Sequence, residues 1–332
     1  PWVDTNRTGM VTIFAIILLV VLGFGAVRLV TAPELSSLDT VPVASFTVVE
    51  NHMGELNNML QEEGIDACRR ETQAVHEQYL SMTERAIDDG AKIILWPELA
   101  IIGIEEDVQA AVAQGQALAQ ESDIYLAMPT YTIFPDAERA AENVLFVADP
   151  DGAIAIEHVK YGGNILEGTL KGSGEIEAID TEYGRVSGII CWDTNYPNIV
   201  RQVGQQNVNI LLSPAKEWDG INPMHAEMAV FRALENGAAV VRQADEGLSI
   251  IVDGYGRTLA SGEGLADGGN YLMAEVPTSS PATLYPIIGD VVGIIALVGL
   301  GALVIVTLIT SRRRKGKEQV SLEKEPLGTS NV

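Results

Sequence analysis

Two long apolar segments stand out along the chain, one near each end, and shorter hydrophobic patterns fill the stretch between them. Residues 10–27 (MVTIFAIILLVVLGFGAV) and 291–310 (VVGIIALVGLGALVIVTLIT) contain no charged residue. A helix of about 20 apolar residues crosses the hydrocarbon core of a bilayer, so we predict transmembrane helices over residues 10–30 and 287–310. A signal peptide is the alternative interpretation of the first segment.

The basic residues beside these segments predict an orientation. The run RRRKGK follows Ser311 directly after the second segment, whereas Arg28 alone follows the first. Lys and Arg close to a span mark its cytoplasmic side, and the larger cluster outweighs the single residue. We therefore expect a multi-pass protein of the cell membrane. Its N-terminal tail (residues 1–9) and basic C-terminal tail (residues 311–332) would lie in the cytoplasm, and the segment between the spans would be extracytoplasmic.

The segment at residues 41–277 alternates strand and helix patterns and is expected to form one domain. Amphipathic stretches that end at Gly90 and Gly237 predict helices, and an Asp151–Gly152 turn joins two apolar runs as a hairpin. Strands that alternate with helices are typical of an α/β protein, and the hairpins make the sheet mixed. Strands are expected in VPVASFTVVE, AKIILW, DIYLAMPTY, NVLFVADPDG, AIAIEHVK, RVSGIIC, NVNILLS, AAVVRQ and LSIIVDGYGRTLA, and helices in TQAVHEQYLSMTERAIDDG, VQAAVAQGQALAQES and NPMHAEMAVFRALENG.

Composition narrows the function classes. Hydrophobic residues make up 47% of the 332 residues and charged residues 20%, a balance that fits a globular domain with membrane spans and excludes a disordered chain. The 45 acidic and 21 basic residues give a formal net charge of −24. Such a surface repels phosphate backbones, so we expect no nucleic acid partner. Among only four His and two Cys no cluster of metal ligands is visible, and we expect neither a metal site nor a cofactor.

Three titratable residues follow apolar runs at the point where each predicted strand ends. Glu98 follows IILWP, Lys160 follows AIAIEHV, and Cys191 follows VSGII. Reactive groups of α/β proteins lie at the carboxyl edge of the sheet. Taken singly, each residue also has a plain structural explanation, as a solvated turn glutamate, a lysine that points to water, or an inert core cysteine.

The sequence around these three residues resembles a known superfamily. ILWPE, a lysine that ends a hairpin, and GRVSGIICWD followed by YP are similar to the nitrilase (carbon–nitrogen hydrolase) superfamily. The stretch Ser213–Ala260 resembles the catalytic domain of the apolipoprotein N-acyltransferase family, and the resemblance extends over about residues 41–277. The matching residues are His225, Met228, Arg232, Ala233, Glu235, Val241, Arg242, Gly247, Ser249, Ile251, Asp253, Gly256 and Arg257.

The resemblance implies both a fold and a mechanism. The fold would be a nitrilase-like, four-layer α-β-β-α sandwich of the α/β class, flanked by transmembrane helices. Glu98, Lys160 and Cys191 would be a catalytic triad, in which Glu98 takes the thiol proton as general base and Lys160 stabilises the thiolate and then the oxyanion. Cys191 would form a thioester with an acyl group, which water or an amine then releases.

Five further residues are candidates for substrate binding. The resemblance implies a second glutamate after the lysine, and Glu167 is the best match, although KYGGNILEGTLKG lacks the family's Pro-Phe-Gly pattern; a solvated loop glutamate is the alternative. Asp193 would line the pocket or cap the helix that follows it. Trp192 and Trp218 would be apolar walls of the pocket or ordinary core residues. His225 would face the site or pack structurally.

Three functions are compatible with the sequence. The leading hypothesis, implied by the resemblance, is a membrane-anchored enzyme that transfers a fatty acyl group from a phospholipid to the amine of a lipoprotein. The first alternative is a membrane-tethered, extracytoplasmic amidase or nitrilase that hydrolyses a small amide. The second is a non-catalytic binding module that retains the fold, against which the complete triad argues.

Overall fold

The computed structural model describes residues 2–48, 63–134, 139–218, 220–263 and 270–322. The end of the first expected strand, at Val49 and Glu50, and residues 323–332 of the expected C-terminal tail lie outside the described residues. The chain divides into two compact units, Pro1–Pro286 and Ile287–Val332. The first unit contains the sheets and the second contains the long C-terminal helix.

The described part of the first unit contains a sheet of seven strands. They are β1 Thr40–Phe46, β2 Ile93–Leu95, β3 Ile101–Ile104, β4 Tyr125–Ile133, β5 Glu142–Ala148, β6 Ile154–Val159 and β13 Tyr271–Pro277. The order is β13-β1-β2-β4-β5-β6, and β3 pairs with β4. β1, β2 and β4 run parallel, whereas β4, β5 and β6 form an antiparallel ladder. The predicted Asp151–Gly152 turn joins β5 to β6, and Gly152 there has a φ of 79°.

A second sheet of six strands faces the first. Its strands are β7 Ala178–Thr181, β8 Gly184–Gly188, β9 Ile210–Lys216, β10 Ala239–Asp245, β11 Leu248–Val252 and β12 Thr258–Glu263. The order is β12-β11-β10-β9-β8-β7. β8, β9 and β10 are parallel, and the outer strands pair antiparallel. Both sheets are therefore mixed, as predicted from the hairpins.

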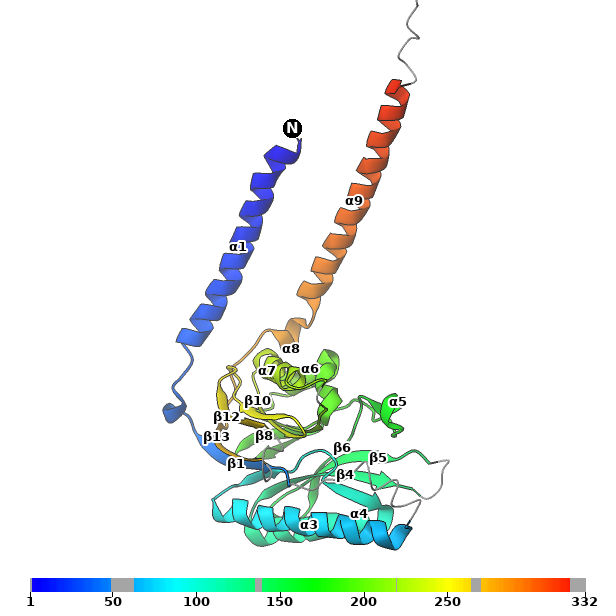
Figure 1. Ribbon diagram of the computed structural model, residues 1–332. Helices are drawn as coiled ribbons and strands as arrows, with labels where there is room; N and C mark the ends of the chain where they lie inside the picture. The colour runs from blue at the N-terminus through cyan, green and yellow to red at the C-terminus, as the bar shows by residue number, and fades with distance from the viewer. Residues whose placement is uncertain (1, 49–62, 135–138, 219, 264–269, 323–332) are drawn as a thin grey trace, which may run out of the picture. The chain divides into compact units, whose positions relative to one another are not determined.

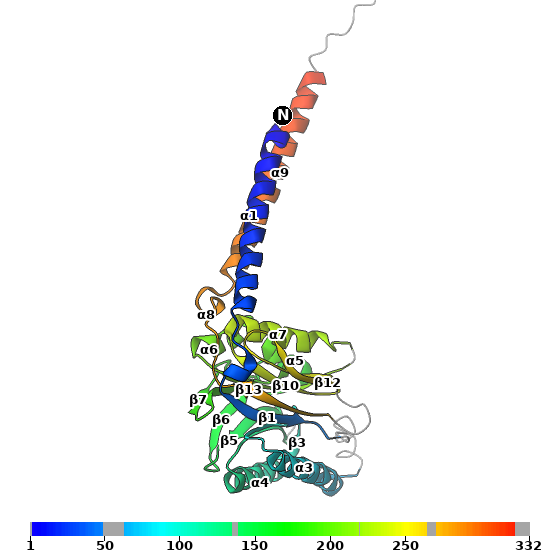
Figure 2. The same ribbon diagram turned by 90° about the vertical axis from the view of Figure 1, so that its left-hand side faces the viewer.

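Helices cover the outer face of each sheet. α3 (Ile65–Asp88) and α4 (Glu105–Ser122) lie on the first sheet, and α6 (Pro197–Gln205) and α7 (Met224–Asn236) lie on the second (Figure 1). Figure 2 shows the same four layers from the side. The apolar core between the sheets includes Leu95 and Leu145 from one sheet and Leu212 and Val241 from the other. The structure confirms the predicted four-layer α-β-β-α sandwich.

The described residues also include four short helical turns. They are η1 Leu35–Ser37, α5 Asn164–Glu167, η2 Cys191–Asn195 and α8 Tyr285–Ile288. Two of them, α5 and η2, occupy the connections after β6 and β8. They carry four of the eight candidate site residues: Glu167, Cys191, Trp192 and Asp193.

The chain also has two long apolar helices, α1 (Trp2–Val30) and α9 (Val291–Leu322). Within them, Gly9–Val30 and Val291–Arg312 are each 22 residues long, apolar enough to cross a membrane, and unburied. Apolar helices of this length and exposure are typical of membrane spans, so they suggest membrane association. Each helix is longer than its predicted span, because no proline interrupts the flanking residues and an established helix extends readily.

Candidate active site

The Glu98 carboxylate lies just beyond β2 and is held by three hydrogen-bond donors. Asn143 Nδ2 and Lys160 Nζ donate to Oε1 over 2.8 and 2.6 Å, and the backbone N–H of Lys216 donates to Oε2 over 2.8 Å. Leu99, the next residue, has a φ of 65°. Non-glycine residues in this region are strained and gather at functional sites. The turn thus fixes both oxygens of a buried carboxylate.

The ammonium of Lys160 lies between two carboxylates at the end of the β5–β6 hairpin. Its Nζ is 2.6 Å from Glu98 Oε1 and 2.5 Å from Glu167 Oε1, and the side chain is buried. Burial alone lowers the pKa of this amine, but nearby negative charge, above all that of Glu98, raises the pKa above its ordinary value. Lys160 therefore provides a fixed positive charge at neutral pH.

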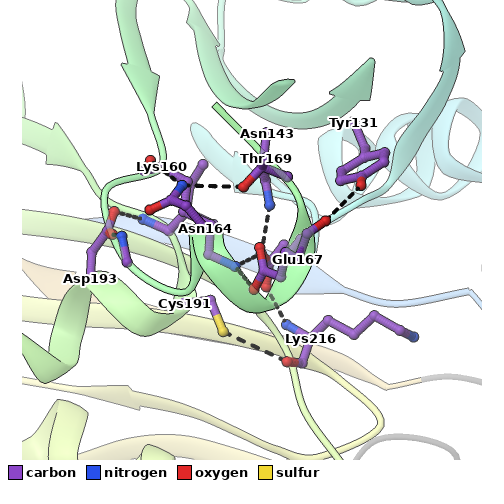
Figure 3. Close-up of polar contacts among 12 residues, drawn as sticks. Tyr131, Asn143, Lys160, Asn164, Glu167, Thr169, Cys191, Asp193 and Lys216 are labelled. Carbon is purple, nitrogen blue, oxygen red and sulfur yellow. Dashed lines mark hydrogen bonds and ion pairs between the residues drawn. The ribbon is translucent and has the colours of Figure 1, made fainter. Parts of the chain in front are cut away.

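Glu167 reaches Lys160 from α5, in the loop that follows β6 (Figure 3). Asn164 closes this loop, since its Nδ2 donates to the backbone oxygens of Lys160 and Leu170, each over 3.0 Å. Burial raises the pKa of Glu167 and Lys160 opposes that shift. The side chain is 33% exposed, so this carboxylate is the more open of the two. We call Glu98, Lys160 and Glu167 the lysine cluster.

The α5 loop also carries apolar side chains that nothing in the described structure covers. Ile165 is 99% exposed, Leu166 79% and Leu170 47%. Ile165 and Leu166 directly precede Glu167 in the chain. An apolar surface therefore adjoins the open carboxylate of the lysine cluster.

Cys191 is the first residue of η2 and lies on a sharp turn. The sequence placed it at the end of a strand, but β8 ends at Gly188 and Cys191 has a φ of 44°. The left-handed conformation turns the chain away from the sheet, and the thiol Sγ lies 3.6 Å from the backbone oxygen of Lys216 (Figure 3). Burial raises the pKa of Cys191 well above its ordinary value; the charge of Glu98 adds to this shift and that of Lys160 opposes it. The resting thiol is protonated at neutral pH.

Both carboxylate oxygens of the buried Asp193 contact neighbouring groups of the protein. Its Oδ1 accepts the backbone N–H groups of Tyr161 and Gly162 over 3.0 and 2.8 Å. Its Oδ2 lies 2.7 Å from His158 Nε2 and accepts the N–H of Ile190 over 3.0 Å. The carboxylate therefore joins the segment after Lys160 to the turn that holds the thiol. The alternative that it caps the next helix is wrong, because the N-cap of α6 is Tyr196.

A second set of charged residues lies close to the thiol. Glu217 Oε2 is 3.0 Å from His225 Nδ1, and Arg242 Nη2 donates to Glu217 Oε1. All three side chains are nearly inaccessible. Burial raises the pKa of Glu217, but its bonds to His225 and Arg242 outweigh this and lower the pKa below its ordinary value. We call these residues the histidine cluster.

The histidine cluster adjoins Cys191 closely enough to form a group of metal-binding atoms. One ligand atom each from Cys191, Glu217 and His225 lies within 4.8 Å of the others. The sequence alone shows no such cluster among its His and Cys residues. Counting His and Cys could not reveal it, because Cys191 lies in the β8–β9 connection, His225 lies in the β9–β10 connection, and the third ligand is a glutamate.

The two predicted tryptophans lie together beside His225. The ring centroids of Trp192 and Trp218 are 6.0 Å apart, and those of Trp192 and His225 are 6.1 Å apart. Trp218 is 49% exposed. The three rings therefore form an aromatic group between the thiol turn and solvent, and Trp218 is not a core residue.

Three residues of the site were missed by sequence reasoning. Asn143 and the backbone of Lys216 hold Glu98, and Glu217 holds His225. Asn143 had a usable signal, as a polar residue in the otherwise apolar strand ENVLFVA, where it is 1% exposed. Lys216 had none, because it acts through its main chain.

Comparison with known proteins identifies a family. The sequence model described as Carbon-nitrogen hydrolase matches residues 61–280. The chain is 28% identical to an apolipoprotein N-acyltransferase of Brucella melitensis over 227 residues, or 58% of this chain and 42% of the relative. It is 28% identical to that of Bradyrhizobium diazoefficiens over 282 residues, or 73% of this chain and 50% of the relative. The chain thus spans about half the length of these curated relatives.

Solved structures share the fold at low identity. A member of branch 10 of the nitrilase superfamily from Saccharomyces cerevisiae aligns with a TM-score of 0.58 and 19% identity, covering 74% of this chain and 93% of that one. A carbon-nitrogen hydrolase from Helicobacter pylori gives 0.58 and 18%, covering 72% and 90%. An amidase from Nesterenkonia sp. AN1, with an acetamide moiety covalently added at its active-site cysteine, gives 0.55 and 17%, covering 74% and 94%.

Proposed function

The chain belongs to the carbon–nitrogen hydrolase family and is an enzyme of that superfamily; from this premise we propose that it transfers a fatty acyl group from a phospholipid to an amine through a thioester on Cys191. The observation that carries the proposal is the match to apolipoprotein N-acyltransferases over 227 and 282 residues. The two exposed apolar helices support it, because a lipid substrate requires an enzyme held at the bilayer.

The first half-reaction would acylate Cys191. Glu98 accepts the thiol proton as the sulfur attacks the ester carbonyl of the phospholipid, and the Lys160 ammonium stabilises the oxyanion. The C–O bond to the lysophospholipid then breaks, and the proton passes from Glu98 to the departing oxygen. Because the resting thiol is protonated, this base is required for every turnover.

The second half-reaction would release the acyl group. An amine attacks the thioester carbonyl, Glu98 removes one proton from the attacking nitrogen, and the C–S bond breaks. The same proton returns to the sulfur and restores the thiol, with an amide as the product. Water in place of the amine would give a fatty acid, so the nature of the acceptor separates a transferase from a hydrolase.

The uncovered apolar side chains of α5 support a lipid donor. Ile165 and Leu166 are almost fully exposed next to Glu167, which itself contacts Lys160. Apolar side chains gain about 25 cal/mol for each Å² removed from water. An acyl chain that enters beside the lysine cluster would cover this surface.

The proposed arrangement has the catalytic domain, residues 41–277, outside the membrane and both tails in the cytoplasm. The basic residues after the second apolar segment support it. Single cysteines introduced into a Cys68→Ser, Cys191→Ser background would test it: one at Ser173 in the domain and one at Ser321 in the tail. A membrane-impermeant maleimide should label intact cells at residue 173 only. Labelling at residue 321 but not 173 would reverse the topology.

A tethered amidase is the second candidate, favoured by the amidase among the fold neighbours. Purified protein would be supplied in parallel with phospholipid plus an amine-bearing lipopeptide, and with a short aliphatic amide. We expect N-acylated lipopeptide and no appreciable ammonia. Ammonia release from the amide, without acylated lipopeptide, would replace the transferase by the amidase. A folded protein inactive on both substrates would leave the non-catalytic module.

A further inference from the structure

We propose that Cys191, Glu217 and His225 form a binding site for Zn²⁺ that blocks the nucleophile. One ligand atom of each lies within 4.8 Å of the others, and all three residues are buried. A thiolate, an imidazole and a carboxylate are the ligand types that zinc prefers, and three protein ligands leave a fourth position for water. The inference goes beyond acyl transfer, and none of its steps requires that activity.

The contact between Glu217 and His225 already resembles a pair of zinc ligands. Glu217 Oε2 and His225 Nδ1 are 3.0 Å apart. Two nitrogen or oxygen ligands at about 2.0 Å from a tetrahedral zinc ion lie about 3.3 Å from each other. Zinc could therefore take the place of the proton between them after a small separation, with the Cys191 sulfur closing the third bond.

Neighbouring side chains hold two of these ligands in place. Arg242 binds Glu217 through Oε1, which leaves Oε2 for the metal. Asn195 Nδ2 lies 2.9 Å from His225 Nε2, while the buried Asn195 Oδ1 has no hydrogen-bond partner. If the amide flips, Oδ1 accepts a proton from Nε2. A metal-binding histidine usually donates its other N–H group to an oxygen in this way.

The protons balance without any other reactant. With Asn195 Nδ2 as donor to Nε2, the His225 ring carries a proton on Nδ1 and donates a hydrogen bond from there to Glu217 Oε2. On zinc binding this proton moves to Nε2, where Asn195 Oδ1 accepts it. The thiol of Cys191 loses its proton to solvent as the Zn–S bond forms. One proton is released for each ion bound. The sulfur lone pair that would attack the acyl carbonyl is then bound to zinc, so Cys191 cannot act as a nucleophile.

The test uses Co²⁺ as a spectroscopic substitute for Zn²⁺ on the full chain in detergent. Co²⁺ should give a near-ultraviolet thiolate-to-metal charge-transfer band that one equivalent of Zn²⁺ removes. Cys191→Ser should abolish the band. His225→Gln and Glu217→Gln should each weaken binding at least about tenfold. Asn195→Leu should weaken it about tenfold, because it removes the hydrogen-bond partner of a metal-binding histidine. Cys68→Ser, which removes the other buried thiol, is the matched control and should bind normally.

Two results would overturn the proposal. One is the absence of a charge-transfer band from the wild-type protein. The other is a band that survives in both His225→Gln and Glu217→Gln, because the thiol alone would then bind the metal. His225→Asn is a further variant should His225→Gln misfold, with circular dichroism to verify each fold. Because metal binding is measured without substrate, failure of the zinc site and failure of acyl transfer are separate outcomes.

Discussion

The two charged clusters that flank Cys191 contain the same kinds of group but differ in what their charges can do. In the lysine cluster, two carboxylates share one ammonium, and Glu98 is otherwise held by the uncharged donors Asn143 and the Lys216 backbone. In the histidine cluster, Glu217 has Arg242 to itself. A guanidinium does not release its proton in a protein, so the positive charge of Arg242 always compensates the negative charge of Glu217.

The difference indicates a division of labour. A carboxylate that takes and returns a proton is hindered by a permanent cation of its own. Glu98 instead shares the Lys160 ammonium with Glu167, which is partly open to solvent. Glu217 is closed off and better suited to hold His225 and the aromatic group in place. We therefore propose that the lysine cluster transfers protons and that the histidine cluster positions other groups of the site. Substitutions on each side should affect different quantities.

The largest effect is expected at the thiol between the clusters. Cys191→Ala should abolish turnover, and Cys191→Ser should reduce it by several orders of magnitude, because a hydroxyl has a much higher pKa than a thiol. Lipopeptide acylation at fixed enzyme concentration measures this. Cys68→Ser is the control, and comparable activity in Cys191→Ala and wild type would exclude Cys191 as the nucleophile.

The next effect is expected on the lysine side. Glu98→Gln keeps the shape of the side chain but cannot accept the thiol proton, so acylation should slow by about 10²–10⁴-fold. The unfolding midpoint should change far less than the rate. Single-turnover acylation and thermal unfolding measure the two quantities. A rate within threefold of wild type would remove Glu98 from the chemistry.

On the histidine side, stability should respond more than rate. Glu217→Gln leaves Arg242 buried without a negative partner, and breaking a buried ion pair costs about 3–5 kcal/mol of unfolding free energy. Glu246→Gln, at a carboxylate 45% exposed, should cost less than about 0.5 kcal/mol. Urea unfolding compares them. If Glu217→Gln instead slows acylation as much as Glu98→Gln at unchanged stability, the division of labour is incorrect.

The smallest effect is expected from the apolar surface beside the lysine cluster. Leu166→Asp should reduce acylation from phospholipid vesicles by up to about tenfold, because part of the 1.5–3 kcal/mol gained by burying a leucine is lost. Acylation from a water-soluble short-chain ester should not change. Leu166→Met retains the apolar surface and serves as the control. Equal losses with both donors would show that Leu166 supports the loop rather than the lipid.

Much of the fold was predictable from local patterns. The alternation of strands and helices, the Asp151–Gly152 hairpin and the helix end at Gly237 depend on neighbouring residues and are present in the structure. The pairing of β13 with β1 was not predicted, although it closes one edge of the first sheet. It joins residues more than 220 positions apart, for example Phe46 and Tyr271, and no short-range pattern encodes such a pairing.

The residues of the candidate site also differ in whether neighbouring residues in the sequence identify them. Glu98, Lys160 and Cys191 could be selected because each follows an apolar run. Glu217 could not, because its importance depends on the side chains that it meets in the folded chain. The sequence analysis placed Cys191 at a strand end, since VSGIIC is uncharged and mostly apolar, and only the φ of 44° reveals the change of direction.

The central claim, a fatty acyl thioester on Cys191, is tested most directly by the intact mass of the protein. The wild-type chain would be mixed with phospholipid of a single acyl composition, without any amine acceptor. The account predicts a mass increase of one acyl group, located at Cys191 by peptide mapping, removed by hydroxylamine and absent from Cys191→Ala. An unchanged mass in folded, membrane-bound wild-type protein, or an increment that persists in Cys191→Ala, would contradict it.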